Sequence, residues 1–209
     1  MISSAHGLDQ LELAGNTLCL DFANTVNARP TARRDYLGSY ADLLAWSAYT
    51  VALPASAVQL LEPRSSGPAA EAVVRDAHRL RDNVYAVFSA IAADRQPERG
   101  EVGLLSAAYA GALANVRIAS GAGLSPGDGA SAYELTWPVR ADQLAAPLWP
   151  VARSAGELLV SGPLERVGEC PSCGWPFLDT SRNGTRRWCS MATCGSRDKM
   201  ARYHRRRRG

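Results

Sequence analysis

Apolar residues recur along most of this chain at the spacing of an amphipathic helix. The clearest stretch is 68–95, where an apolar residue returns every three or four positions from Val73 to Ile91 and charged residues occupy the opposite side. Pro97 follows and favours an end to that helix. The same pattern predicts four further helices, over 39–49, 54–61, 101–115 and 140–160.

Local signals refine these helices. Ser39 and Asp42 form a capping box at the start of the first of the four. Pro147 and Pro150 must kink or split the last one. The inward side of the helix over 101–115 is expected to comprise Leu104, Leu105, Ala108, Ala112 and Leu113.

Strand signals are fewer. Apolar and polar residues alternate over 131–137, and this stretch can pair with 115–120 as a β-hairpin. The connection over 121–130 is rich in glycine but lacks the GK[ST] sequence of a phosphate-binding loop. The apolar run over 18–26 fits a helix or a strand equally well, and Cys19 within it is expected to be a buried, inert thiol.

These elements predict a mainly α domain over 1–160, a helical bundle with a small β-hairpin. Ser161, Gly162 and Pro163 then break the chain. The remaining residues, 164–209, are too few to bury a large apolar core, so we expect a small second domain that needs additional stabilisation.

Electric charge divides the chain at the same place. Residues 1–160 carry 12 basic and 16 acidic side chains, a net charge of −4. Residues 161–209 carry 11 basic and 4 acidic side chains, a net charge of +7. A basic tail on an acidic body indicates an anionic partner for the tail.

Four of the five cysteines follow the pattern C-x2-C-x15-C-x4-C in the basic tail: Cys170, Cys173, Cys189 and Cys194. Four thiolates at this spacing are typical of a closed, tetrahedral structural Zn²⁺ site. Disulfides would need an oxidising compartment, and a redox-active CxxC would need a thioredoxin-like βαβ context. One structural zinc ion is therefore the expected cofactor, and it would supply much of the folding free energy of the tail.

The compartment follows from what the sequence lacks. The first thirteen residues show no basic cluster followed by an apolar stretch, as a secretory signal would. The uncharged stretch 43–61 is long enough to be considered as a membrane span, but Pro54 interrupts it and polar residues dilute it. We expect two short helices there, no membrane association and a cytoplasmic protein.

Within the tail, Trp175, Phe177 and Trp188 are expected to form a miniature core, with a hairpin of 166–169 and 175–179 around the first cysteine pair. Ser196 is the expected N-cap of a final basic helix that runs toward the C-terminus. Arginine and lysine can neutralise phosphates and read base edges, so the basic side chains form a candidate nucleic-acid-binding set. Its members are Arg182, Arg186, Arg187, Arg197, Lys199, Arg202, Arg205, Arg206, Arg207 and Arg208.

Two motifs resemble known families. The sequence around the second cysteine pair, from Trp188 through Cys194-Gly195 to Lys199, resembles the CGNR zinc finger, as do 177–183 and Arg186-Arg187; Ser196 stands where that family has asparagine. Upstream, the run Leu18-Cys19-Leu20-Asp21-Phe22-Ala23-Asn24-Thr25 is similar to the start of the ABATE domain, which usually precedes this finger.

The resemblance implies a treble-clef-like zinc finger over 164–209, an ABATE-like helical domain over 1–160, and a bacterial, stress-induced transcription regulator that binds DNA. The helical domain would sense a ligand or stress signal, and Asp21 and Asn24 would line a candidate ligand pocket or tie a buried turn. A single finger binds weakly, so a homodimer is a reasonable expectation. The alternatives are an RNA-binding protein, or a protein- or small-molecule-binding module with a purely structural zinc site.

An enzyme is not expected. The three histidines, His6, His78 and His204, lie far apart in the chain and near no nucleophile motif, and a four-cysteine site leaves zinc no open position for catalysis.

Overall fold

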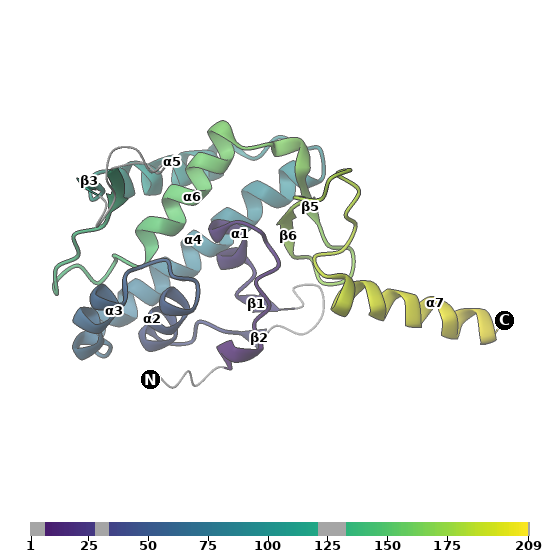
Figure 1. Ribbon diagram of the computed structural model, residues 1–209, viewed down its shortest axis with the longest axis horizontal. Helices are drawn as coiled ribbons and strands as arrows, with labels where there is room; N and C mark the ends of the chain where they lie inside the picture. Colours follow the sequence, from purple (N-terminus) through teal and green to yellow (C-terminus); the bar gives the residue numbers. More distant parts are fainter. Residues whose placement is uncertain (1–6, 28–33, 121–132, 209) are drawn as a thin grey trace.

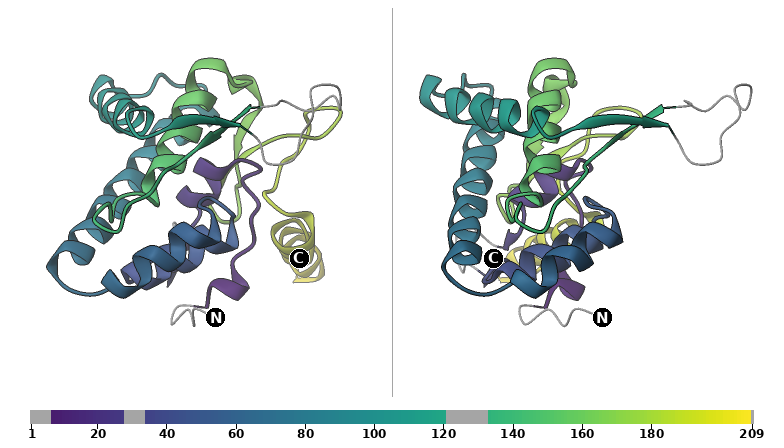
Figure 2. Two further views of the ribbon diagram at one scale, coloured as in Figure 1. Left: turned by 60° about the vertical axis from the view of Figure 1, so that its left-hand side comes forward. Right: turned by 90° about the vertical axis from the view of Figure 1, so that its left-hand side faces the viewer.

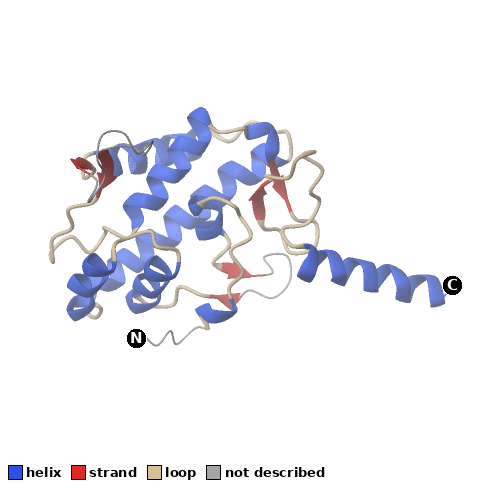
Figure 3. Ribbon diagram, viewed as in Figure 1, coloured by secondary structure: helices blue, strands red, loops and turns tan. Residues whose placement is uncertain are grey.

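The computed structural model describes residues 7–27, 34–120 and 133–208. It is mostly helical (Figure 1, Figure 3), as predicted. Within the described ranges the α-helices are α1 (Leu18–Ala23), α2 (Tyr40–Tyr49), α3 (Ala55–Leu61), α4 (Pro68–Ala92), α5 (Arg99–Leu113), α6 (Leu148–Ser161) and α7 (Ser196–Arg208). The strands form two-stranded antiparallel sheets: β1 (Val26–Asn27) with β2 (Arg34–Asp35), β3 (Arg117–Ser120) with β4 (Tyr133–Thr136), and β5 (Val167–Glu169) with β6 (Pro176–Leu178).

Helix α4 is the central element of the fold (Figure 1). Gly67 precedes it with a φ of 94°, and Pro68 occupies the first turn, where a missing N–H costs nothing. The face predicted from the apolar spacing is buried, including Val84, Val87 and Phe88. Helices α1, α2, α5 and α6 all contact α4, so its buried face organises one core.

The uncharged stretch 43–61 folds as the two short helices expected from its sequence. The Ser39 hydroxyl accepts a hydrogen bond from the Asp42 N–H at 3.2 Å and caps α2, and Pro54 precedes α3. Among the described residues, no helix is both long and apolar enough to cross a bilayer.

Helices α5 and α6 correct two expectations. Leu105 and Ala112 face inward as predicted, but Leu104 is 66% exposed and Leu113 is 40% exposed. Helix α6 begins only at Leu148, directly after Pro147, and Pro150 lies in its first turn, whereas most of residues 140–147 form turns. The predicted split therefore removes the first two turns of the expected helix.

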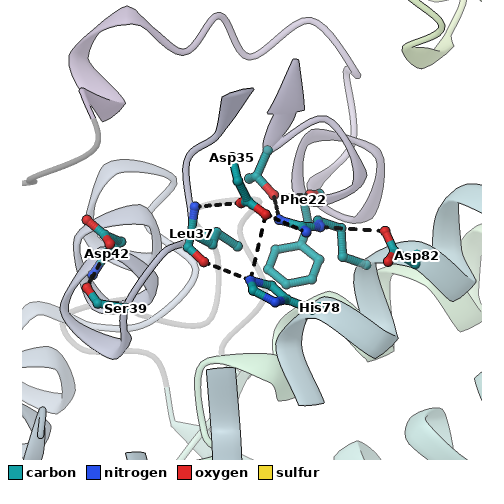
Figure 4. A network of polar contacts seen from close by, with 9 residues as sticks. Phe22, Asp35, Leu37, Ser39, Asp42, His78 and Asp82 are labelled. Atoms are coloured by element: carbon teal, nitrogen blue, oxygen red, sulfur yellow. Dashed lines mark hydrogen bonds and ion pairs between the residues drawn. The ribbon is translucent and has the colours of Figure 1, made fainter. Parts of the chain in front are cut away.

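The ambiguous run over 18–26 is helical up to Ala23 and then enters β1. The β1–β2 pair was not predicted, and polar contacts fix it to α4 (Figure 4). The buried Arg81 guanidinium donates two hydrogen bonds to the Asp35 carboxylate, at 2.7 and 2.8 Å. His78 Nε2 lies 2.7 Å from the Leu37 carbonyl oxygen, so this histidine has an ordinary structural contact.

The predicted hairpin is confirmed as β3–β4, with Ile118 opposite Leu135. It extends away from the helices (Figure 2). His6 and the glycine-rich connection over 121–130 lie outside the described residues.

Candidate metal centre and basic helix

The four cysteines of the tail meet in space. Their sulfur atoms all lie within 4.8 Å of one another, and all four residues are buried. Cys173 Sγ is 3.5 Å from Cys189 Sγ, and Cys189 Sγ is 3.7 Å from Cys194 Sγ. A tetrahedron of sulfurs around zinc, with Zn–S near 2.3 Å, has edges of about 3.8 Å. The cluster therefore has the dimensions of a four-thiolate zinc site.

Electrostatics also favours a cation at this cluster. Hydrogen bonds from the Cys173 and Cys189 thiols hold the pKa of Cys170 far below its ordinary value. Interaction with the Cys170 and Cys173 thiols, together with burial, raises the pKa of Cys189 far above it. Thiolates this close to one another would repel, so ionisation of all four requires a cation that compensates their charge.

The fifth cysteine lies outside the four-cysteine cluster. Cys19 is fully buried on α1, and burial raises the pKa of its thiol to about 11. It has the properties of a small buried side chain, as expected.

Two elements deliver the cysteine pairs. The turn between β5 and β6 carries Cys170 and Cys173, and the Gly174 N–H closes it on the Cys170 carbonyl at 2.8 Å. Cys189 precedes the first turn of the C-terminal helical segment, and Cys194 lies within that turn. A hairpin knuckle facing the start of a helix is the arrangement expected of a treble-clef-like finger.

The loop between the pairs is organised by Asp179. Its carboxylate accepts hydrogen bonds from the Ser181 N–H at 2.8 Å and the Arg186 N–H at 2.7 Å. A hydrogen bond from the Ser181 side chain, with these backbone donors, holds the pKa of Asp179 below its usual value. The carboxylate therefore stays ionised and fixes the loop that leads to Cys189.

Arg186 belongs to this internal framework. Its guanidinium donates to the carbonyl oxygens of Ala14, Trp188 and Cys189 and lies 4.6 Å from the centre of the Phe177 ring. These contacts engage its Nε and Nη2 donors within the protein. They give Arg186 a structural role, and we leave it out of the DNA contacts proposed below.

The start of the basic helix differs from expectation. A single turn of π-helix over Met191–Gly195 precedes α7, and Ser190 caps it by accepting a hydrogen bond from the Thr193 N–H at 3.4 Å. Ser196 is already helical and donates its hydroxyl to the Met191 carbonyl oxygen at 3.1 Å. Ser196 is thus not the N-cap, and its side chain closes the turn that holds Cys194.

Helix α7 projects from the body of the molecule into solvent (Figure 1, Figure 2). Arg197, Lys199, Arg202, Arg205 and Arg207 are all exposed. Arg202 also pairs with Asp198 one turn earlier, at 3.0 Å. Arg182 and Arg187 are exposed on the preceding loop, whereas the side chains of Arg206 and Arg208 lie outside the described part.

The finger is bound to the helical domain through residues 12–26 and through α4, whose Ser89 hydroxyl donates to the Glu169 carboxylate. The Leu178 N–H donates to the Gly15 carbonyl at 2.9 Å, and the Asn16 amide donates to the Leu178 carbonyl at 2.8 Å. The buried Trp175 indole N–H donates to the Val26 carbonyl at 2.8 Å. Buried residues of the finger and of the helices form one continuous core.

Asp21 and Asn24 lie at this junction. The Asn24 amide donates to the Pro176 carbonyl at 3.0 Å, and Asp21 Oδ1 accepts from the Gly15 N–H at 2.8 Å. A side chain at Gly15 would collide with the α1 backbone at Asp21, so glycine permits this close approach. These contacts give both polar side chains a structural role at the junction, and their role in a ligand pocket stays a prediction.

The buried Asp21 should make stability depend on pH. Burial raises its pKa to about 6, although the Gly15 hydrogen bond and the charge of Arg186 act in the opposite direction. The folded chain therefore binds the proton more tightly than the unfolded chain, and this contribution to stability is lost as pH rises through about 6.

Asp21→Asn is accordingly expected to gain about 1 kcal/mol more, relative to the parent protein, at pH 7.5 than at pH 5. Urea unfolding of both proteins at the two pH values measures this difference. An equal effect of the substitution at both pH values would contradict the assignment.

Sequence reasoning missed several residues of the site. Asp179 stood within the motif resembling the finger but received no role, and Ser190 was not considered as a cap. The sequence signal that could have identified both residues is a Ser, Thr or Asp near a cysteine pair, because such residues cap turns and helices.

Models of two known families match the two parts of the chain. Residues 16–162 match the family model ABATE, described as "Putative stress-induced transcription regulator". Residues 166–207 match the CGNR zinc finger, and the four-cysteine cluster can hold its one zinc ion. Neither description is that of a catalytic family. A search of curated proteins found no match to the chain.

Proposed function

Since the chain belongs to the ABATE family and ends in a CGNR zinc finger, we propose that it is a transcription regulator whose finger docks on DNA. The division at 161–163 then separates an ABATE-like helical domain, over 1–160, from the DNA-binding finger over 164–209. In this proposal the helical domain senses a ligand or stress signal and holds the finger through a fixed interface.

The observation that carries the proposal is the exposure of α7. The helix has 13 residues and extends about 20 Å at 1.5 Å per residue. It projects beyond the body, so a duplex can approach it without meeting α1 to α6 (Figure 1). A B-DNA major groove is about 12 Å wide and accepts an α-helix. A zinc-anchored, arginine-rich helix of this kind fits that groove.

The proposed contacts are divided by position. Arg182 and Arg187 precede the helix and would bind phosphates, while the basic side chains of α7 would bind phosphates and base edges. This second group comprises Arg197, Lys199, Arg202, Arg205, Arg206, Arg207 and Arg208.

A gel-shift titration of the zinc-loaded chain tests the proposal. If about six phosphates are neutralised, the affinity should fall on the order of 10³-fold between 50 and 200 mM salt. Lys199→Ala with Arg205→Ala should weaken binding to all duplex sequences and reduce the salt slope by about 2. Arg64→Ala with Arg75→Ala, which removes two exposed arginines near the start of α4 and away from the finger, is the matched control.

Two results would count against DNA as the partner. The first is a folded, zinc-loaded protein that is not retained on any duplex at low salt. The second is displacement of duplex DNA by a single-stranded RNA competitor at equal concentration. The second result would favour the RNA alternative, for which the exposed Tyr203 on α7 offers an aromatic stacking surface.

A further inference from the structure

A groove with an apolar floor lies between α4 and α5, away from the finger junction. Its volume is about 560 Å³. Leu80 and Ala86 of α4 face Leu104 and Ala108 of α5 across it. Leu104, which was expected to face the core, is instead the exposed wall of this groove. The volume is in the range of pockets that hold small molecules.

The groove continues toward α6. A second hollow of about 400 Å³ shares Asp76, Leu80 and Ala108 with the first and extends to Leu148 and Trp149. Trp149 packs against Trp137 at the base of the β3–β4 hairpin, with ring centres 6.0 Å apart. An aromatic or branched apolar molecule could therefore lie along the groove and meet an indole at its far end.

The charged residues that line the groove are mainly acidic. They are Asp76, Asp82 and Glu101, with Arg79 as the single cation among the lining residues of the described chain. Arg79 pairs with Asp76 at 3.1 Å, so its charge is already balanced within the groove. The Asp82 carboxylate lies 3.8 Å from Arg81 Nε, but the Asp35 carboxylate already balances the charge of Arg81, so an excess of negative charge remains. An apolar floor combined with an excess of carboxylates favours ligands that are both apolar and positively charged.

We propose that this groove binds an amphipathic organic cation, a compact apolar or aromatic molecule with a delocalised or shielded positive charge. The apolar body would contact Leu80, Leu104 and Trp149, and the charge would lie near the carboxylates of Asp82 and Glu101. Such a cation is poorly hydrated, so transfer into the groove costs little desolvation and gains both contacts. The inference is independent of DNA binding.

Two ions of the same shape and opposite charge provide the test. Tetraphenylphosphonium and tetraphenylborate are titrated into the full-length, zinc-loaded protein by calorimetry, without DNA. The phosphonium is expected to bind with one-to-one stoichiometry. No detectable phosphonium binding, or borate binding that is as tight and equally sensitive to changes in the groove, would overturn the proposal.

Substitutions then locate the bound cation. Asp82→Asn with Glu101→Gln should weaken phosphonium binding about fivefold to tenfold, the effect of two partly exposed ion pairs. Glutamine retains the capping role of Glu101 at the start of α5. Leu104→Gln should also weaken binding at least severalfold, and this exposed position leaves the core intact. Glu157→Gln, an exposed carboxylate on α6, is the matched control.

An unchanged affinity in both groove variants, with folding confirmed by circular dichroism, would place the phosphonium elsewhere and refute the assignment. A loss in the Glu157 control equal to that in the double variant would refute it as well, because the effect would then follow net charge alone.

Discussion

Substitution of Cys189 by serine is expected to abolish stoichiometric zinc binding and to destabilise the helical domain together with the finger. Serine removes one of four thiolates that lie within 4.8 Å of one another. Zinc ligation in small finger modules is worth on the order of 10 kcal/mol, and a finger of this size has little apolar core of its own. The loss should reach the helices because the finger shares their core.

Metal analysis and thermal unfolding measured on the helical signal test this expectation. The melting temperature should fall by about 10 °C or more, the change for a loss of several kcal/mol in a chain of this length. Cys19→Ala is the matched control, since it removes a buried thiol outside the cluster. That variant should retain zinc and lose only the modest stability of a small cavity.

A Cys189→Ser protein that retained one zinc per chain would contradict the assignment of the four cysteines as a zinc site. A variant that lost zinc but kept the melting temperature of the parent would instead show that the finger and the helices unfold independently.

The second large effect is expected at the junction itself. Trp175→Ala removes a buried indole that packs in the shared core and donates to the Val26 carbonyl at 2.8 Å. We expect a loss of about 3–5 kcal/mol of unfolding free energy, the usual cost of deleting a buried tryptophan. Chemical denaturation with zinc in excess measures it without confusion from metal loss.

A graded series separates packing from hydrogen bonding at this position. Trp175→Phe keeps much of the apolar volume but leaves the Val26 carbonyl without its donor, and should cost about 1–3 kcal/mol. Trp188→Ala, at the partly buried tryptophan of the same finger, should cost less than Trp175→Ala. If the two alanine variants lost equal amounts of unfolding free energy, the contact between Trp175 and β1 would not contribute more to stability than ordinary packing in the finger.

The sequence was sufficient for features that depend on local periodicity. The 25-residue α4 follows from regularly spaced apolar residues, and the β3–β4 hairpin follows from alternation. The metal centre was predictable because four cysteines at zinc-finger spacing permit few other interpretations. Each of these signals is contained within one continuous stretch of chain.

Features that depend on distant residues were missed. The outward position of Leu104 reflects where α4 ends and α5 crosses it, and no local pattern contains that information. The interaction of Arg186 with Ala14 joins residues 172 positions apart, so its basic side chain was first assigned to phosphate binding. Asp21 and Asn24 were ambiguous for the same reason, because their contacts depend on how α1 meets Gly15 and the finger.

The packing of residues 12–26 against β6 also limits how such proteins can diversify in evolution. A chimaera that joins this helical half to the finger of a distant paralogue would place unfamiliar side chains against Asn16, Asn24 and the Val26 carbonyl. Recombination at the glycine–proline break would therefore yield unstable proteins unless both segments that contact the finger, residues 12–26 and the C-terminal part of α4, were exchanged with it. If the proposed DNA-binding role holds, new specificities should arise instead by point substitution at the exposed positions of α7.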